Sequence, residues 1–482
     1  MDVHESVLQL IGGTPLVRLR TPAGGSAAVY AKVEFASAGG SSKDRIGLRM
    51  IEKAERDGLL SPGGTVVEAT SGNTGIAVAM VAARKGYRAV VVVSDRISRE
   101  KLAMLRAFGA EVVVCPGGLP REHPDHPVNA AARIAEETPG AWLAAQYDNP
   151  ANPEAHYLTT GPEIWRQTGG RVTHLVSCVG TGGTISGAGR YLKEVSGGTV
   201  EVVGADPASS VYSGGDGRPY FIEAAGHFRH PETVDDPWPS SYHQDVVDRV
   251  LPVTDRDALL SIRRLAREEG LLAGGSSGTA LAAALRVGAA AGPGAVVVVV
   301  LPDSGRHYLS KYFDDAWMLR MGFLDGDEDG TRLADTVTTD ESAPPLPYLP
   351  ARTTVADALA ALRAGRDGDA PAVLPTGPCP VGPGRRPTAP ELTGSVTLEG
   401  LEAAVRDGGT TLTAAVGERP GPPLPHFGYG EPASAVLAEL DGCGQDTAVV
   451  LRDGQAMALI TSSRLRAALA GLPSPPRAPA TR

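Results

Sequence analysis

Short valine-rich runs alternate with longer amphipathic segments over residues 1–325, and this alternation limits the possible folds more than any other feature of the sequence. The runs are apolar at consecutive positions, as strands are when helices cover both faces of a sheet. A helix between successive strands favours parallel pairing, because a parallel crossover needs about a dozen residues. We therefore predict an α/β fold with strands at 65–69, 89–93, 111–114, 174–179, 201–205 and 295–301, and helices at 45–57, 75–85, 98–108, 184–194, 256–269 and 279–287.

Four runs of small residues interrupt this pattern, at 39–43, 70–75, 180–184 and 274–278. Two of them, 70–75 and 180–184, directly follow a predicted strand and open a predicted helix. Ligands of covered parallel sheets bind beyond the carboxyl ends of the strands. We therefore expect these loops to gather around one ligand site.

Lys43 ends the first of these runs. A lysine that forms an imine with an aldehyde must lose its proton, which partial burial and neighbouring dipoles favour. Taken alone, Lys43 is better explained as a solvated surface lysine. The other three loops supply what a phosphorylated aldehyde cofactor needs, and together with Lys43 they indicate pyridoxal 5'-phosphate (PLP).

The second and third loops each suit an anion. Gly180, Thr181, Gly182, Gly183 and Thr184 place backbone N–H groups at the start of a helix, where phosphate binds well. A tight structural turn or a nucleotide loop is the alternative, but a P-loop is excluded because no Gly-Lys-Ser/Thr follows, and the Rossmann spacing is absent.

The loop with Thr70, Ser71, Gly72 and Thr74 suits a substrate carboxylate, and Asn73 can donate to the ring hydroxyl of PLP. Ser71 or Thr74 as a helix N-cap is the alternative, and both roles are compatible. Ser276 is predicted to face the pyridine nitrogen, with a simple N-cap again as the alternative. A serine there leaves the ring unprotonated, which suits β-elimination.

Composition excludes several classes of protein. The net charge of −10 and the lack of a basic block argue against a nucleic-acid partner. The four cysteines, Cys115, Cys178, Cys379 and Cys443, are far apart, which argues for a reducing compartment and against disulfides or a metal site. No signal peptide is visible, and the longest apolar run, 295–301, is too short to span a membrane, so we expect a cytoplasmic protein.

The composition changes after residue 323, with a short acidic stretch and then dense proline. Two weak half-repeats follow: a helix at 353–362, a strand at 392–396 and a helix at 398–405, then a helix at 433–440, strands at 447–451 and 457–460, and a helix at 463–469. Residues 371–390 are expected to form a loop because of their proline and glycine content. The predicted domains are a catalytic domain at 1–325, a linker at 326–345, an α+β domain at 346–472 and a disordered tail at 473–482.

Several motifs carry a resemblance to a known family, among them Ile11-Gly-Gly-Thr-Pro-Leu16, Glu68-Ala-Thr-Ser-Gly-Asn-Thr-Gly75, Gly180-Thr-Gly-Gly-Thr184 and Leu301-Pro-Asp-Ser-Gly305. Residues 1–325 resemble the cystathionine β-synthase and cysteine synthase family of fold-type II PLP enzymes. The resemblance implies two parallel-sheet subdomains and a homodimer. It implies Lys43 as the imine lysine, Asn73 on the ring hydroxyl, residues 180–184 on the phosphate and Ser276 on the ring nitrogen. The substrate carboxylate would be held by Thr70, Ser71, Thr74 and Gln146. The haem-binding extension of animal relatives is missing, so no haem is expected.

Two regions depart from the family. Its usual active-site motif Glu-Gly-x-Gly is replaced by Glu223, Ala224, Ala225 and Gly226, and residues 227–234 look like an insertion, so the second substrate is expected to differ or to bind differently. Residues 346–472 resemble a degenerate pair of CBS modules, with Ile460-Thr-Ser-Ser-Arg464 where a ribose-binding aspartate is common. We expect these modules to support dimerisation and not activation by adenosylmethionine.

The resemblance implies a β-replacement on L-serine or an O-activated serine, with a thiol as the nucleophile. Homocysteine would give cystathionine. The alternatives are a cysteine synthase, a specialised enzyme with another nucleophile or leaving group, and a catalytically inactive ligand sensor.

Overall fold

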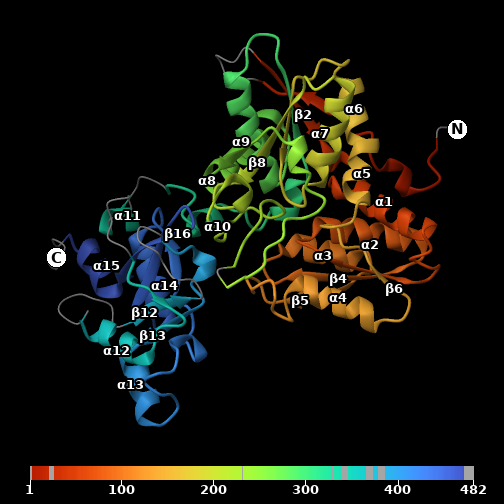
Figure 1. Cartoon of the computed structure of the whole chain (residues 1–482). Helices are drawn as coiled ribbons and strands as arrows, with labels where there is room; N and C mark the ends of the chain where they lie inside the picture. The colour runs from red at the N-terminus through yellow and green to blue at the C-terminus, as the bar shows by residue number, and fades with distance from the viewer. Residues whose placement is uncertain are drawn as a thin grey trace. The chain divides into compact units, whose positions relative to one another are not determined.

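The computed structural model describes residues 3–20, 27–230, 232–326, 330–337, 346–364, 373–377 and 386–471. The chain divides into two compact units, Met1–Phe313 and Asp314–Arg482 (Figure 1). Each unit has its own sheets and its own apolar clusters.

The first unit contains two sheets. The larger has the strand order β1-β2-β10-β7-β8-β9, and all of its neighbours are parallel except β1 and β2. The smaller, of order β5-β4-β3-β6, is entirely parallel. The strands are β1 (Leu16–Arg18), β2 (Ala28–Val33), β3 (Thr65–Ala69), β4 (Arg88–Ser94), β5 (Glu111–Cys115), β6 (Ala141–Leu143), β7 (His174–Cys178), β8 (Glu201–Pro207), β9 (Arg249–Val253) and β10 (Val296–Leu301). The predicted α/β class with two parallel-sheet subdomains is confirmed.

Helices connect and cover these strands. Around the smaller sheet, α2 and α3 lie on one face and α4 on the other (Figure 1), which is why every residue of β3 is buried. The helices of the unit are α1 (Lys43–Arg56), α2 (Asn73–Lys85), α3 (Arg99–Ala107), α4 (Pro127–Glu137), α5 (Ala151–Leu158), α6 (Thr160–Gln167), α7 (Gly183–Val195), α8 (Asp255–Glu269) and α9 (Gly275–Ala290). All six predicted strands and all six predicted helices of this unit are present, with small shifts at their ends.

The second unit repeats one order of elements, strand-helix-strand-strand-helix, twice. In each copy the first strand is parallel to the second and the second is antiparallel to the third. The first copy holds β11 (Leu349–Pro350), α12 (Val355–Ala364), β12 (Val373–Gly377), β13 (Gly394–Thr397) and α13 (Leu398–Arg406); the second holds β14 (His426–Gly428), α14 (Ala433–Cys443), β15 (Thr447–Arg452), β16 (Gln455–Thr461) and α15 (Ser462–Leu469). Two short helices, α10 (Asp315–Arg320) and α11 (Leu333–Thr336), precede them.

The prediction of a loop over residues 371–390 was wrong, because β12 lies within this stretch as the middle strand of its sheet. Leu374 is buried in the apolar cluster of the first copy. Pro375 lies before Thr376 and Gly377, the only residues of β12 that pair with β11, so its missing N–H costs no bond on that side. Part of the stretch, 371–372 and 378–385, lies outside the described residues.

Residues 314–326 belong to the second unit, so the division between units falls before the predicted boundary at 325. Backbone bonds join this segment to the turn between β15 and β16: Asp453 N donates to Gly322 O at 3.0 Å and Gly454 N donates to Met321 O at 2.9 Å. Arg320 also pairs with Glu431 at 3.0 Å. The predicted linker contains α11, and the predicted tail at 473–482 lies outside the described residues. Within the described ranges, no helix has the length and apolar character required to cross a membrane.

Candidate active site

Lys43 is the first residue of α1 and is half-buried. The loop before it is fixed to the segment that follows β10, since Ser42 N donates to Pro302 O at 2.7 Å and Ser304 N donates to Gly40 O at 3.2 Å. Burial lowers the pKa of the Lys43 amine, and the Asp303 carboxylate opposes this shift. The position thus favours a neutral amine, which is the form that can act as a nucleophile or a base.

Asp303 joins three of the four small-residue loops. Its buried Oδ2 accepts hydrogen bonds from Asn73 Nδ2 at 2.8 Å and from the Tyr308 hydroxyl at 2.5 Å. Its backbone oxygen accepts from Gly274 N at 2.9 Å, and Ser41 forms a β-bridge with it. A Cβ at Gly274 would lie 2.1 Å from Asp303 Oδ1, so only glycine fits there. Asp303 was not among the predicted site residues.

A second chain of contacts joins the remaining loop to the first three. Thr74 Oγ1 donates to Gln146 Oε1 at 2.6 Å. Asn152 Nδ2 then donates both to the backbone oxygen of Gln146, at 2.8 Å, and to Thr181 Oγ1, at 3.0 Å. The predicted phosphate loop and the predicted substrate loop therefore meet through Gln146 and Asn152.

His156 links the phosphate loop to the start of α6. Its Nε2 lies 3.1 Å from Thr184 Oγ1, and its Nδ1 lies 2.8 Å from Thr160 Oγ1. Burial, together with the positive charges of Lys43 and Arg45, holds the pKa of His156 well below its ordinary value. A neutral His156 can both accept from and donate to the two hydroxyls, which fixes Thr184 in place.

Comparison of the chain with known proteins identifies its family. A family model described as "Pyridoxal-phosphate dependent enzyme" matches residues 7–303. The chain belongs to this family. It is 43% identical to cystathionine beta-synthase of Oryctolagus cuniculus over 331 residues, which is 67% of this chain and 58% of that protein. It is 44% identical to cysteine synthase of Staphylococcus aureus over 317 residues, 64% of this chain and 98% of that protein.

Among solved structures, this PLP-dependent enzyme is similar to O-ureido-L-serine synthase. The TM-score is 0.60 at 38% identity, with 68% of this chain and 98% of that chain covered. A hydrogen sulfide-producing enzyme from Fusobacterium nucleatum gives a TM-score of 0.59 at 34% identity, over 64% of this chain and 100% of that chain. The chain spans about 58% of the length of the rabbit relative.

The residues fit PLP. Asn73 Oδ1 and Ser276 Oγ are among the buried polar atoms that have no hydrogen-bond partner within the described residues. They belong to the residues predicted to contact the ring hydroxyl and the ring nitrogen. Because Asn73 Nδ2 donates to Asp303, Asn73 would accept from the ring hydroxyl through Oδ1 and not donate to it as predicted. Gly182 has a φ of +83° directly before α7, and a Cβ at Gly183 would lie 1.8 Å from Asn152 Oδ1. Positions 182 and 183 of this loop thus require glycine. The loop presents backbone N–H groups at the start of a helix, where a phosphate binds well.

The predicted substrate loop starts α2. Gly72 has a φ of +123°, and its N–H donates to Thr70 Oγ1 at 3.0 Å. Thr70 and Thr74 are buried, whereas Ser71 is exposed. The hydroxyls of this loop therefore differ in access, and Ser71 is the one open to solvent.

The altered loop lies against the phosphate loop. Gly226 N donates to Val179 O at 2.7 Å, and a Cβ on Gly180 would lie 3.0 Å from Ala224 O. Ala224 has a φ of +62°, in the left-handed region that favours glycine, and Ala225 is buried. The structure thus brings Ala224, Ala225 and Gly226 next to Gly180.

The predicted insertion continues from this loop and is held at several points. His227 Nε2 lies 2.7 Å from Asp236 Oδ1, and the His227 ring meets the edge of Tyr212. Tyr212 in turn donates to Gly180 O at 2.9 Å. The backbone N–H of Val234 donates to Glu122 Oε1 at 2.9 Å. These contacts connect the segment with the phosphate loop on one side and with residue 122 on the other.

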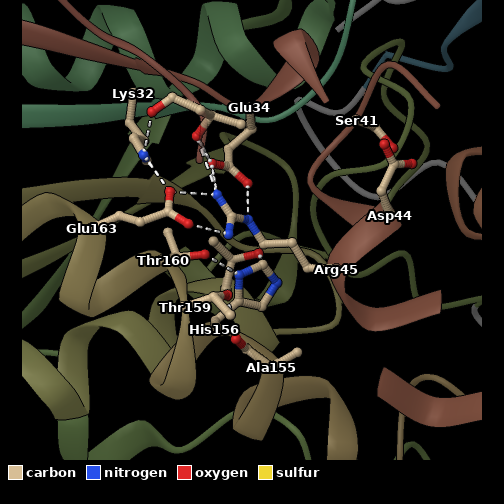
Figure 2. A network of polar contacts seen from close by, with 12 residues as sticks. Lys32, Glu34, Ser41, Asp44, Arg45, Ala155, His156, Thr159, Thr160 and Glu163 are labelled. Atoms are coloured by element: carbon tan, nitrogen blue, oxygen red, sulfur yellow. Dashed lines mark hydrogen bonds and ion pairs between the residues drawn. The ribbon is translucent and has the colours of Figure 1, made fainter. Parts of the chain in front are cut away.

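A buried ionic network supports α1 just after Lys43 (Figure 2). Arg45 Nε lies 2.7 Å from Glu34 Oε2, and Arg45 Nη1 lies 2.7 Å from Glu163 Oε1. Lys32 Nζ lies 2.6 Å from Glu163 Oε2. The two cations hold the pKa of Glu163 down at about 2 despite its burial. The network joins β2, α1 and α6 and was not predicted from the sequence, because its members lie far apart in the chain.

Proposed function

We propose that this chain catalyses a PLP-dependent β-replacement on L-serine or an O-activated serine, with homocysteine as the thiol nucleophile and cystathionine as the product. The observation that carries the proposal is the half-buried Lys43 amine within a set of loops that also presents Asn73 Oδ1 and Ser276 Oγ, two buried atoms with no hydrogen-bond partner in the described part of the chain. The similarity to cystathionine beta-synthase and cysteine synthase supports the reaction class.

When bound, PLP withdraws electrons from the amino-acid substrate, so that the α-proton and the β-substituent can leave. Lys43 would hold the cofactor and then accept the α-proton, a role for which burial prepares it by favouring the neutral amine. Thr70, Ser71, Thr74 and Gln146 would orient the substrate carboxylate at the start of α2. Ser276, a hydroxyl and not a carboxylate, would face the ring nitrogen without adding a negative charge.

Replacement of Lys43 tests the proposal. We expect Lys43→Ala to purify without the yellow colour of the wild type and to lose roughly a thousandfold or more in turnover. Lys53→Ala is the matched control, because Lys53 lies on the same helix, is also half-buried and pairs only with Asp57 among the ion pairs of the described residues. Borohydride reduction followed by peptide mapping should place the pyridoxyl label on Lys43. A label on another lysine would overturn the assignment.

A specialised β-substitution is the second candidate. It is favoured by the methyl groups of Ala224 and Ala225 in the loop beside Gly180 and by the similarity to O-ureido-L-serine synthase. Serine, O-acetylserine and O-phosphoserine should be assayed against homocysteine, sulfide and hydroxyurea, with products identified by mass. Cystathionine as the main product supports the first candidate, and an O-substituted serine supports the second.

We also propose that the chain works as a cytoplasmic homodimer. The family resemblance supports the dimer, and the widely spaced cysteines support a reducing compartment. Sedimentation at several concentrations tests the oligomeric state, and fractionation of cells tests the location.

A further inference from the structure

Three charged side chains meet beside the substrate loop, apart from the groups that the proposed reaction uses. Glu223 Oε2 lies 3.0 Å from Lys101 Nζ, and Glu223 Oε1 lies 2.6 Å from Lys311 Nζ. The Lys101 side chain is fully buried and that of Glu223 is 13% exposed. The cluster carries one excess positive charge if all three groups are ionised.

Each member of the cluster comes from a different segment. Lys101 lies on α3, contacts the substrate loop by donating to Ser71 O at 3.4 Å, and has its Nζ 4.4 Å from the centre of the Tyr308 ring. Lys311 donates to Arg96 O at 2.9 Å. Glu223 opens the altered loop, and its own N–H donates to the Tyr312 hydroxyl at 3.0 Å. The carboxylate of Glu223 therefore connects the altered loop to the substrate loop and to the segment after β10.

The cluster is held together by charge. The two lysines keep the pKa of Glu223 below its ordinary value although burial opposes this. Loss of the carboxylate would leave two ammonium groups facing each other in a partly dry site, which is strongly unfavourable. The charge on Glu223 thus keeps the first residue of the altered loop beside Lys101 and Lys311.

We propose that Glu223 is a positioning residue for the second substrate, whose carboxylate fixes the loop of residues 223–226 so that the incoming nucleophile has a defined path to the site. The proposal rests on the proposed function. The far end of the loop has its own anchor, since Gly226 N donates to Val179 O at 2.7 Å and Ala224 O lies 3.0 Å from where a Cβ on Gly180 would be. Loss of the Glu223 carboxylate therefore releases the start of the loop and leaves the phosphate loop in place. The substrate loop keeps most of its support without Glu223, because Thr70, Thr74 and Gln146 are held by their own bonds. The bond from Lys101 to Ser71 O does not involve the Glu223 carboxylate.

The first test compares the two halves of the reaction in Glu223→Gln holoenzyme. We expect the colour of the enzyme, and the rate of the spectral change on adding serine or O-acetylserine alone, to stay within about twofold of the wild type. The KM for the thiol should rise roughly tenfold, with a smaller change in kcat. The matched control is Glu201→Gln, because Glu201 also lies between two basic groups, His174 and Arg249, but at the start of β8.

The second test does not use activity. Arg229 is exposed shortly after the altered loop, so release of Glu223 should speed tryptic cleavage after Arg229 in Glu223→Gln, and not in Glu201→Gln. The double variant Glu223→Gln/Lys311→Gln removes the repulsion and should recover part of the wild-type KM and protease resistance.

The outcomes separate this inference from the proposed function. An unchanged thiol KM with unchanged cleavage after Arg229 would overturn the role of Glu223. An equal loss in both half-reactions would overturn it as well, because Glu223 would then act on the whole site. A wild-type enzyme that shows no spectral change with any serine derivative would overturn the proposed function instead.

Discussion

Ala224 holds a backbone conformation that costs an L-residue about 1 to 2 kcal/mol relative to the right-handed region, because its Cβ crowds the following carbonyl. Glycine avoids this cost but adds freedom to the unfolded chain, which offsets about 0.5 to 1 kcal/mol of the gain. The neighbouring Ala225 is buried and has no such positive φ. The two alanines therefore provide a matched pair within one loop.

We expect Ala224→Gly to be neutral or to stabilise the protein by up to about 1 kcal/mol, and Ala225→Gly to destabilise it by about 1 to 2 kcal/mol. Urea unfolding of both variants measures the difference. If the Ala224 methyl also restricts the second substrate, Ala224→Gly should accept more nucleophiles in the substrate screen. Equal destabilisation by both changes would contradict this account of Ala224.

Individual site residues could be predicted from the sequence where a functional side chain stands in a run of small residues. Lys43, Asn73 and Ser276 stood in runs of small residues, and the structure places all three at the meeting point of the loops. Asp303 was not predicted because an aspartate after a strand has many possible uses. Lys101 and Lys311 were missed for a similar reason, since lysines on amphipathic segments are usually solvated. Their importance depends on partners that are distant in the sequence.

The elements around the site are joined by the ionic network of Arg45, Glu34, Lys32 and Glu163. Glu163 balances both Lys32 and Arg45, and Lys32 is completely buried. Removing one partner of a buried ion pair typically costs about 3 to 5 kcal/mol, because the remaining charge is left uncompensated. Since the network supports α1 two residues after Lys43, this cost should also be visible at the cofactor site.

We therefore expect Glu163→Gln to lower the free energy of unfolding by about 3 kcal/mol or more and to speed the loss of PLP on dilution. Glu154→Gln is the control, since Glu154 pairs with Arg49 at 3.0 Å but is 41% exposed, and should cost less than about 1 kcal/mol. Chemical denaturation monitored by the cofactor absorbance and by circular dichroism gives both values. A similar decrease in the free energy of unfolding for both variants would show that burial of the ion pair does not determine its contribution to stability.

The predicted elements were right where the sequence pattern is strongest. Strands β3, β4 and β10 are valine-rich and buried, and each was found. The strand β2 was missed because Lys32 interrupts its apolar run, and only the ion pair with Glu163 makes that lysine a core residue. The strand β9 is at the edge of its sheet and contains Pro252, which an edge tolerates and a sequence pattern counts against a strand. The strand β12 was missed for the same reason, because it contains Pro375.

At the scale of the whole molecule, the segment 314–326 follows directly after the catalytic motifs in the sequence but belongs to the second unit. Arg320 stacks on Phe427 at 4.4 Å and pairs with Glu431 and Glu439, and Met321 packs against the apolar cluster around β15. A second unit that begins after this segment would lose these contacts.

We expect a fragment of residues 314–471 to be more stable than one of residues 327–471 by roughly 2 to 4 kcal/mol, the scale of a lost apolar side chain and a partly buried ion pair. Thermal unfolding of the two fragments measures the difference, and Arg320→Ala in the longer one should remove part of it. Equal melting temperatures would show that residues 314–326 add nothing to the second unit.

The hydrogen bond between Asn73 and Asp303 spans 230 residues of sequence, and it constrains the order of events during synthesis. A nascent chain grows at about 5 to 20 residues per second, so Asn73 must wait on the order of tens of seconds for its partner to be made. Over that interval β2 also lacks β10, its parallel neighbour, and presents an open edge to other chains. A chaperone that covers exposed strand edges is therefore expected to act on the ribosome-bound chain. PLP binding by stalled nascent chains should be detectable only after residue 303 has left the exit tunnel.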